Sequence, residues 1–180
     1  MNKKRALLLD RDGVINADHG YVGTVEKFDF MPGLFPFLRA ARDLGFRLAI
    51  LTNQSGVARG HYTEADYTRV TAHMLAALKR EGVEIDLVLA CFAHPEGKMA
   101  PYVRESFWRK PNPGMVLEAV RKLGLDADRS VFLGDALRDM GAARAGGIGT
   151  CLWLTQEKVE APESIVIVRS FDEVLIRLSA

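Results

Sequence analysis

Short runs of apolar residues alternate along this chain with longer segments in which apolar and polar positions are mixed. The runs are flanked by glycine, proline or charged residues, a pattern that indicates buried β-strands. We predict strands at residues 5–9, 46–51, 87–92, 130–133, 150–154 and 165–168.

The segments between the runs have helical spacing. In the longest, Val70, Met74 and Leu78 recur three or four residues apart and would share one side of a helix. Ser170 and Glu173 form the sequence pattern of a capping box before the last helix. We predict helices at residues 34–44, 63–81, 113–123 and 138–145, and one that follows residue 170.

This alternation of strands and helices predicts an α/β fold: a three-layer, Rossmann-like domain with a central parallel sheet and helices on both faces. We expect residues 1–180 to form a single domain, because no linker or repeat interrupts the pattern. Ligands of such sheets bind at the carboxyl ends of the strands. The residues that follow positions 9, 51, 92 and 133 are therefore the first candidates for chemistry.

The overall composition points to no large charged or lipid partner. Lys and Arg number 24 against 23 Asp and Glu, giving a net charge of +1, so we expect neither nucleic-acid nor membrane binding. Cys91 and Cys151 are far apart, which favours a reducing compartment, and we expect a cytoplasmic protein. Without a heptad pattern or a long apolar patch, a monomer is expected.

Carboxylates follow the first predicted strand. On a regular strand Asp10 and Asp12 would share a face and Arg11 would point the other way, while Gly13 permits a sharp turn. A carboxylate at the end of a buried strand is costly unless a cation compensates it, although a solvated turn is the alternative. After the fourth strand come Asp135 and Asp139. Several acids at one sheet edge with oxygen ligands only favour Mg²⁺.

Residues suited to phosphate follow the second and third strands. Thr52 begins a run of small polar side chains after residue 51, which matches the needs of phosphate oxygens as well as those of an ordinary polar loop. Before the helix at 113–123, Pro111 and Pro113 fix the backbone around Lys110 and so hold a compact ammonium group rigidly, although an ordinary basic loop is the alternative.

Together these segments resemble the four motifs of haloacid-dehalogenase (HAD)-type phosphatases: LLDRDGVIN at 8–16, LTNQSG at 51–56, RKPNPG at 109–114, and LGD at 133–135 followed by Asp139. More narrowly, DHGY at 18–21 and TNQS at 52–55 resemble the group of heptose-1,7-bisphosphate 7-phosphatases and histidinol-phosphate phosphatases. The resemblance implies a HAD-like domain without a large cap domain.

The resemblance also implies roles for individual residues. Asp10 would be the nucleophile and a Mg²⁺ ligand, and Asp12 the general acid and base, whose backbone carbonyl also binds the metal. Asp135 would complete the metal site, with Asp139 in support, while Thr52 and Lys110 would hold the transferring phosphoryl group. Substrate contacts are implied for Asp18, His19, Gly20, Tyr21, Asn53, Gln54, Ser55 and Arg109.

The implied function is hydrolysis of the C7 phosphate of D-glycero-D-manno-heptose 1,7-bisphosphate through a phospho-aspartate, in the heptose branch of lipopolysaccharide synthesis. A histidinol-phosphate phosphatase, another small phosphomonoesterase and an inactive phosphate-binding module are the alternatives. The basic residues around Arg109 favour a bisphosphorylated substrate over a cationic one. A phosphomutase is the weaker alternative, because no large cap is expected to exclude water.

One motif of many relatives is missing. They carry a structural zinc on a Cys-x-His pair and a later Cys-x-Cys pair, but here the aligned positions are Cys91-Phe92-Ala93 and Ser106-Phe107-Trp108. His94 lies one place late, and it cannot close a tetrahedral site with Cys91 alone. We expect no structural zinc and instead expect the aromatic residues to pack this loop.

Overall fold

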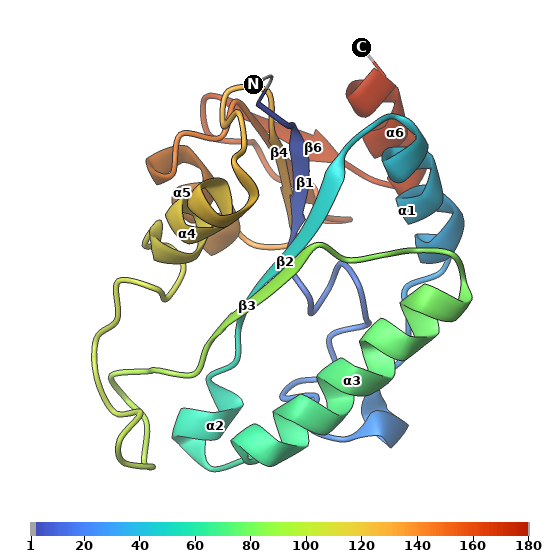
Figure 1. Cartoon of the computed structure of the whole chain (residues 1–180). Coiled ribbons are helices and arrows are strands. Elements are labelled where there is room, and N and C mark those ends of the chain that lie inside the picture. The colour runs from blue at the N-terminus through green and yellow to red at the C-terminus, as the bar shows by residue number, and fades with distance from the viewer. Residues whose placement is uncertain (1–2, 180) are drawn as a thin grey trace.

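A computed structural model describes residues 3–179 and contains one six-stranded sheet of order β3-β2-β1-β4-β5-β6 (Figure 1). Every neighbouring pair of strands is parallel. The strands are β1 (Ala6–Leu9), β2 (Arg47–Asn53), β3 (Leu87–Cys91), β4 (Val131–Gly134), β5 (Thr150–Leu154) and β6 (Ile165–Val168). The predicted parallel α/β architecture is confirmed.

Helices cover both faces of this sheet, as Figure 1 shows. They are α1 (Leu34–Asp43), α2 (Gly56–Arg59), α3 (Glu64–Arg80), α4 (Gly114–Leu123), α5 (Leu137–Ala145) and α6 (Phe171–Ser179), with a short 3-10 helix η1 (Val25–Lys27). The apolar sides of α1, α3 and α6 pack on one face, and those of α4 and α5 pack on the other. No helix within residues 3–179 has the length and apolar character needed to span a bilayer.

The sheet divides the interior into two apolar cores. Along β1, Leu7 and Leu9 belong to the core beneath α1, α3 and α6, whereas Ala6 and Leu8 belong to the core beneath α4 and α5. All four are fully buried. This follows from the alternation of side chains along a strand, and it explains why β1 is apolar throughout.

The strand order places the crevice expected to bind a ligand between the carboxyl ends of β1 and β4. The chain builds β1, β2 and β3 outward in one direction and then returns to add β4, β5 and β6 on the other side of β1. At such a switch point the loops leave the sheet in opposite directions and open a crevice at the carboxyl ends of the strands. Asp10 and Asp135 follow these two strands directly. Among the described residues, no separate cap domain covers this edge.

Some boundaries differ from the sequence predictions. Thr52 and Asn53 extend β2, because they pair in register with Ala90 and Cys91 of β3. The four-residue helix α2 and helix η1 were not predicted, since both are too short to show a helical period. Only one of the two hydrogen bonds of the predicted capping box before α6 forms. The Glu173 N–H donates to Ser170 Oγ at 3.3 Å, but the Glu173 carboxylate accepts from the backbone N–H of Arg169.

Candidate active site

A buried lysine joins two of the predicted acidic residues. Lys110 Nζ lies 2.9 Å from Asp10 Oδ1 and 2.7 Å from Asp139 Oδ1, and it donates to the carbonyl of Leu51 at 2.7 Å. Two ion pairs and one hydrogen bond therefore surround the ammonium group. Burial alone would lower the pKa of Lys110, but Asp10 and Asp139 together raise it, so the lysine stays charged.

The Asp10 carboxylate is fixed in orientation and short of positive charge. Its Oδ1 accepts the backbone N–H of Arg11 at 2.7 Å in addition to the Lys110 ammonium. Burial, followed by the neighbouring charge of Asp139, raises the pKa of Asp10 to about 8, against the opposing effect of Lys110. One lysine therefore does not neutralise the acids around it.

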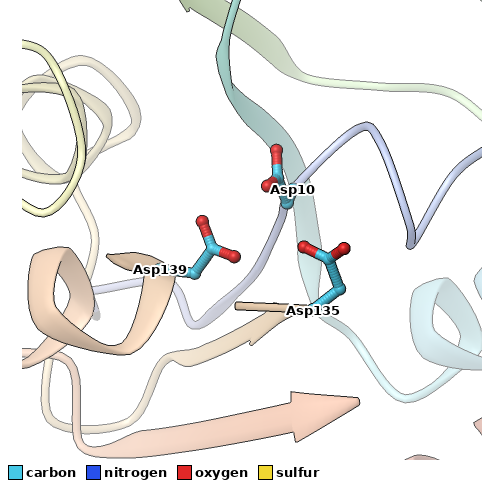
Figure 2. Close-up of side chains that lie close together, drawn as sticks. All are labelled: Asp10, Asp135 and Asp139. Atoms are coloured by element: carbon cyan, nitrogen blue, oxygen red, sulfur yellow. The ribbon is translucent and has the colours of Figure 1, made fainter. Parts of the chain in front are cut away.

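The carboxylates of Asp10, Asp135 and Asp139 point toward one another, as Figure 2 shows, and each offers an oxygen within 4.8 Å of the others. Asp135 Oδ1 is buried without a hydrogen-bond partner, and burial with nearby Asp139 raises the pKa of Asp135 to about 6. A cluster of hard oxygen donors with unbalanced negative charge fits a divalent cation such as Mg²⁺.

Gly13 permits the close approach of the first loop to Asp135. The glycine has φ +81°, and a Cβ atom placed there would lie 2.1 Å from Asp135 Oδ2. Any larger residue would meet both a strained backbone conformation and this carboxylate. Glycine at position 13 therefore lets the loop after β1 lie against the loop after β4 that carries Asp135.

Asp139 supports the cluster from the first turn of α5. Its Oδ2 accepts the backbone N–H of Ala136 at 3.1 Å, which caps the helix, and its Oδ1 faces Lys110. Oδ2 is thus hydrogen-bonded within the protein, and Oδ1 is ion-paired. This geometry suits the supporting role expected for Asp139 better than direct coordination.

The conformation after β1 differs from the regular strand that we expected. The strand ends at Leu9, and Arg11 does not turn away but is buried, with its terminal nitrogen 2.8 Å from Asp12 Oδ1. Arg11 also donates to the carbonyl of Val22 at 3.2 Å. The alternation rule fails here because the chain leaves the sheet at Asp10, and the loop then sets the direction of each side chain.

A hollow of about 260 Å³ opens beside Asp12. Of the predicted substrate residues, Asp18, Gly20, Tyr21, Asn53, Ser55 and Arg109 line it. Asp10, Thr52 and Lys110 are buried at the sheet edge. Asn53 also links the end of β2 to the segment that carries Lys110, since its side chain exchanges hydrogen bonds with the backbone of Lys110 at 3.0 and 3.1 Å.

Two predicted substrate residues are placed elsewhere. The His19 ring is directed to Asp29, with Nε2 lying 2.8 Å from its carboxylate, and it does not line the hollow. Gln54 is buried, and its side-chain amide bonds to Asp12, Thr52 and Tyr62 rather than facing the hollow. This geometry therefore does not favour direct contact between the substrate and the side chains of His19 and Gln54.

Two polar side chains that line the hollow were not predicted from the sequence. Arg138 stands one turn after Asp135, with its guanidinium 3.9 Å from Asp135 Oδ1. Tyr62 follows α2 and reaches back to Gln54. The position of Arg138, three residues after Asp135, was the signal available in the sequence. Nothing in the local sequence marked Tyr62.

The loop that follows β3 has polar and aromatic contacts of its own. His94 accepts the Glu96 N–H on Nδ1 at 3.0 Å, and its Nε2 lies 3.0 Å from an Arg59 nitrogen. Burial, then Arg109 and Arg59, lower the pKa of His94. Phe92 packs edge-on against Tyr67 and Tyr102. The packing expected of the other two aromatics is wrong: Phe107 is 60% exposed and Trp108 38% exposed.

Comparison with known proteins supports the motif assignment. The HAD-hydrolase-like family model matches residues 107–169. The chain is 46% identical over 150 residues to the D-glycero-alpha-D-manno-heptose-1,7-bisphosphate 7-phosphatase of Burkholderia mallei, covering 83% of this chain and 79% of the relative. It is 40% identical over 159 residues to the D-glycero-beta-D-manno-heptose-1,7-bisphosphate 7-phosphatase of Escherichia coli K12, covering 88% and 83% respectively.

A solved structure supports the same family through its fold. The D,D-heptose 1,7-bisphosphate phosphatase of B. bronchiseptica, complexed with magnesium and phosphate, superposes with a TM-score of 0.82 at 26% identity, covering 97% of this chain and 98% of that one. The parallel sheet and the buried acid–lysine cluster are consistent with the family that these similarities indicate. The chain belongs to the HAD superfamily of phosphatases, in the family of the heptose-1,7-bisphosphate 7-phosphatases.

Proposed function

We propose that this enzyme removes the C7 phosphate of D-glycero-D-manno-heptose 1,7-bisphosphate through a phospho-aspartate on Asp10. The observation that carries the proposal is the placement of buried Asp10 against Lys110, with Asp135 and Asp139 around them and Asp12 at the open hollow. A buried, oriented carboxylate beside a fixed ammonium is the arrangement needed for nucleophilic attack on a phosphoryl group.

In the first step an Asp10 carboxylate oxygen attacks phosphorus, and the bond to the sugar oxygen breaks. Lys110 and the Thr52 hydroxyl hold the equatorial oxygens, whose charge must be stabilised while the phosphoryl group transfers. Asp12 protonates the departing sugar oxygen. It then takes a proton from the water that attacks the acyl phosphate, which releases inorganic phosphate and restores Asp10.

We propose Mg²⁺ as the cofactor, held by the side chains of Asp10 and Asp135 and the backbone carbonyl of Asp12, with Asp139 in support. The unbalanced carboxylates, and the buried Asp135 Oδ1 that lacks a hydrogen-bond partner, support this assignment. When bound, the ion supplies positive charge to the transferring phosphoryl group. No zinc is proposed, since only Cys91 of the four aligned ligand positions keeps its residue and His94 lies one place late.

The substrate is proposed to be a small phosphorylated sugar with a second anionic group. Arg109 and Arg138 both line the hollow, where they favour an anion over the cationic amine of histidinol phosphate. The relatives named above act on the α or the β anomer of the heptose bisphosphate. We propose that the enzyme works as a cytoplasmic monomer, and its two free, buried cysteines suit a reducing compartment.

The test is phosphate release by purified enzyme in the presence of Mg²⁺. The panel contains both anomers of the heptose bisphosphate, histidinol phosphate and simple sugar monophosphates. The proposal predicts the highest kcat/KM for one bisphosphate anomer and loss of activity in EDTA. A preference for histidinol phosphate would refute the substrate assignment, whereas no turnover of any compound would favour a phosphate-binding module.

A further inference from the structure

Both oxygens of the Asp12 carboxylate receive hydrogen bonds from the protein. Oδ1 accepts from Arg11 at 2.8 and 3.3 Å and from the Asn16 amide at 3.0 Å. Arg11 and Asn16 are both buried. Oδ2 accepts from Gln54 Nε2 at 2.8 Å. Asp12 keeps 19% of its side chain exposed and lines the hollow, so proton exchange with a bound substrate falls to the less crowded oxygen, Oδ2.

The Gln54 amide has a definite orientation. Its NH₂ group, which can only donate, faces the Asp12 carboxylate, with Nε2 lying 2.8 Å from Oδ2. The same nitrogen lies 2.8 Å from Thr52 Oγ1 and donates its second hydrogen there. This leaves the hydrogen of the Thr52 hydroxyl free for a phosphoryl oxygen. The amide oxygen then faces Tyr62, whose hydroxyl donates to it at 2.6 Å.

Tyr62 is held in place by two glycines. A Cβ atom on Gly23 would lie 2.5 Å from the tyrosine ring, and one on Gly56 would lie 2.1 Å from it. Neither glycine has a φ angle that requires the residue, so the ring is the reason why a side chain cannot stand there. Burial raises the pKa of Tyr62, which keeps its hydroxyl protonated and able to donate.

We propose that Gln54 and Tyr62 are positioning residues: Tyr62 fixes the Gln54 amide, and that amide aims Asp12 Oδ2 at the leaving oxygen of the substrate. The inference rests on the proposed function, in which Asp12 is the general acid. In that step the Oδ2–H bond and the phosphorus–oxygen bond of the substrate break, and the proton forms a new O–H bond on the sugar. Gln54 serves through Asp12 and Thr52 and does not bind substrate directly.

Leaving-group dependence separates positioning from binding. The ratio kcat/KM includes steps only up to departure of the leaving group. A sugar alkoxide needs a proton to depart, whereas p-nitrophenolate is stable without one. Loss of Asp12 alignment must therefore lower kcat/KM for a sugar phosphate much more than for p-nitrophenyl phosphate. Loss of a contact to the phosphoryl group would lower both values alike, because both substrates carry that group.

The experiment compares wild type with Gln54→Leu, Tyr62→Phe and Asp12→Asn, all with Mg²⁺. The substrates are p-nitrophenyl phosphate and the best sugar phosphate of the panel above. We expect Gln54→Leu to lower kcat/KM about 100-fold for the sugar phosphate but only about 3-fold for the nitrophenyl ester. Tyr62→Phe, which removes one hydroxyl and little volume, should show the same bias at about 5-fold, roughly the effect of one hydrogen bond. Asp12→Asn should show the largest bias.

Equal losses on both substrates in Gln54→Leu and Tyr62→Phe, with the bias kept in Asp12→Asn, would overturn the positioning role and leave the proposed function standing. Absence of bias in Asp12→Asn would overturn both. Should Gln54→Leu fold poorly, as judged by circular dichroism, Tyr62→Phe alone decides the question, because its ring still fills the space beside Gly23 and Gly56.

Discussion

At the scale of single residues, the site depends on a carboxylate that the fold stabilises poorly in its charged form. Asp10 is buried with one lysine and two further acids, so ionisation of Asp10 is costly without a cation. This cost is a property of the metal-free protein, and it has a measurable consequence for stability.

The pH dependence of the metal-free protein should report on Asp10. Its pKa is raised from 3.8 to about 8, so the folded state holds a proton that the unfolded chain releases. The free energy of unfolding should therefore fall through this group as pH rises from about 4 to about 8. Asp10→Asn lacks the titration but resembles protonated Asp10. In urea unfolding with EDTA, its stability relative to wild type should increase over that range. If the difference in unfolding free energy between Asp10→Asn and wild type stays constant or falls as pH rises, the raised pKa of Asp10 is contradicted.

At the scale of elements, the local pattern predicted the strands and long helices but not the segments that shape the site. The apolar runs located all six strands, because a strand buried on both faces must be apolar throughout. The direction of Arg11 and the burial of Gln54 were not predictable, since both depend on how loops leave the sheet. Tyr62 lies eight residues beyond Gln54, where α2 returns the chain to the hollow.

The turn after β1 can be tested with Gly13→Ala. The methyl group meets Asp135 Oδ2 and a left-handed backbone conformation, so the loop or the carboxylate must move. A displacement of about 1 Å in such a site can cost about 100-fold in rate. We expect a loss of that order in kcat/KM and a higher Mg²⁺ concentration at half-maximal activity. Gly45→Ala also has a positive φ but lies in open space, so it controls for backbone strain. Equal behaviour of the two variants would contradict the close-approach argument.

At the scale of the whole molecule, the site exists only because the sheet order brings distant segments together. Asp10, Lys110 and Asp135 come from three separate loops, and the strand order places those loops at one edge. The sequence predicted which residues carry charge at strand ends. The order of the strands was not predictable from periodicity, which contains no information on which strands are neighbours.

Mg²⁺ should stabilise the folded protein as a whole. Binding to the native state alone adds about 2.7 kcal/mol at 100 times the dissociation constant. For a chain of this size that corresponds to an increase in Tm of roughly 5–10 °C. Thermal scans with Mg²⁺ and with EDTA should show this difference, and Asp135→Asn should reduce it. A Tm that does not change on addition of Mg²⁺ would contradict the metal assignment.

Removal of the C7 phosphate by Asp10 can be followed by ³¹P NMR of heptose 1,7-bisphosphate turned over with Mg²⁺. We expect the C7 phosphomonoester signal to disappear, the C1 phosphate signal to remain and inorganic phosphate to appear. A well-folded Asp10→Asn variant should leave both signals unchanged. Release of the C1 phosphate, or near-normal turnover by Asp10→Asn, would contradict this assignment.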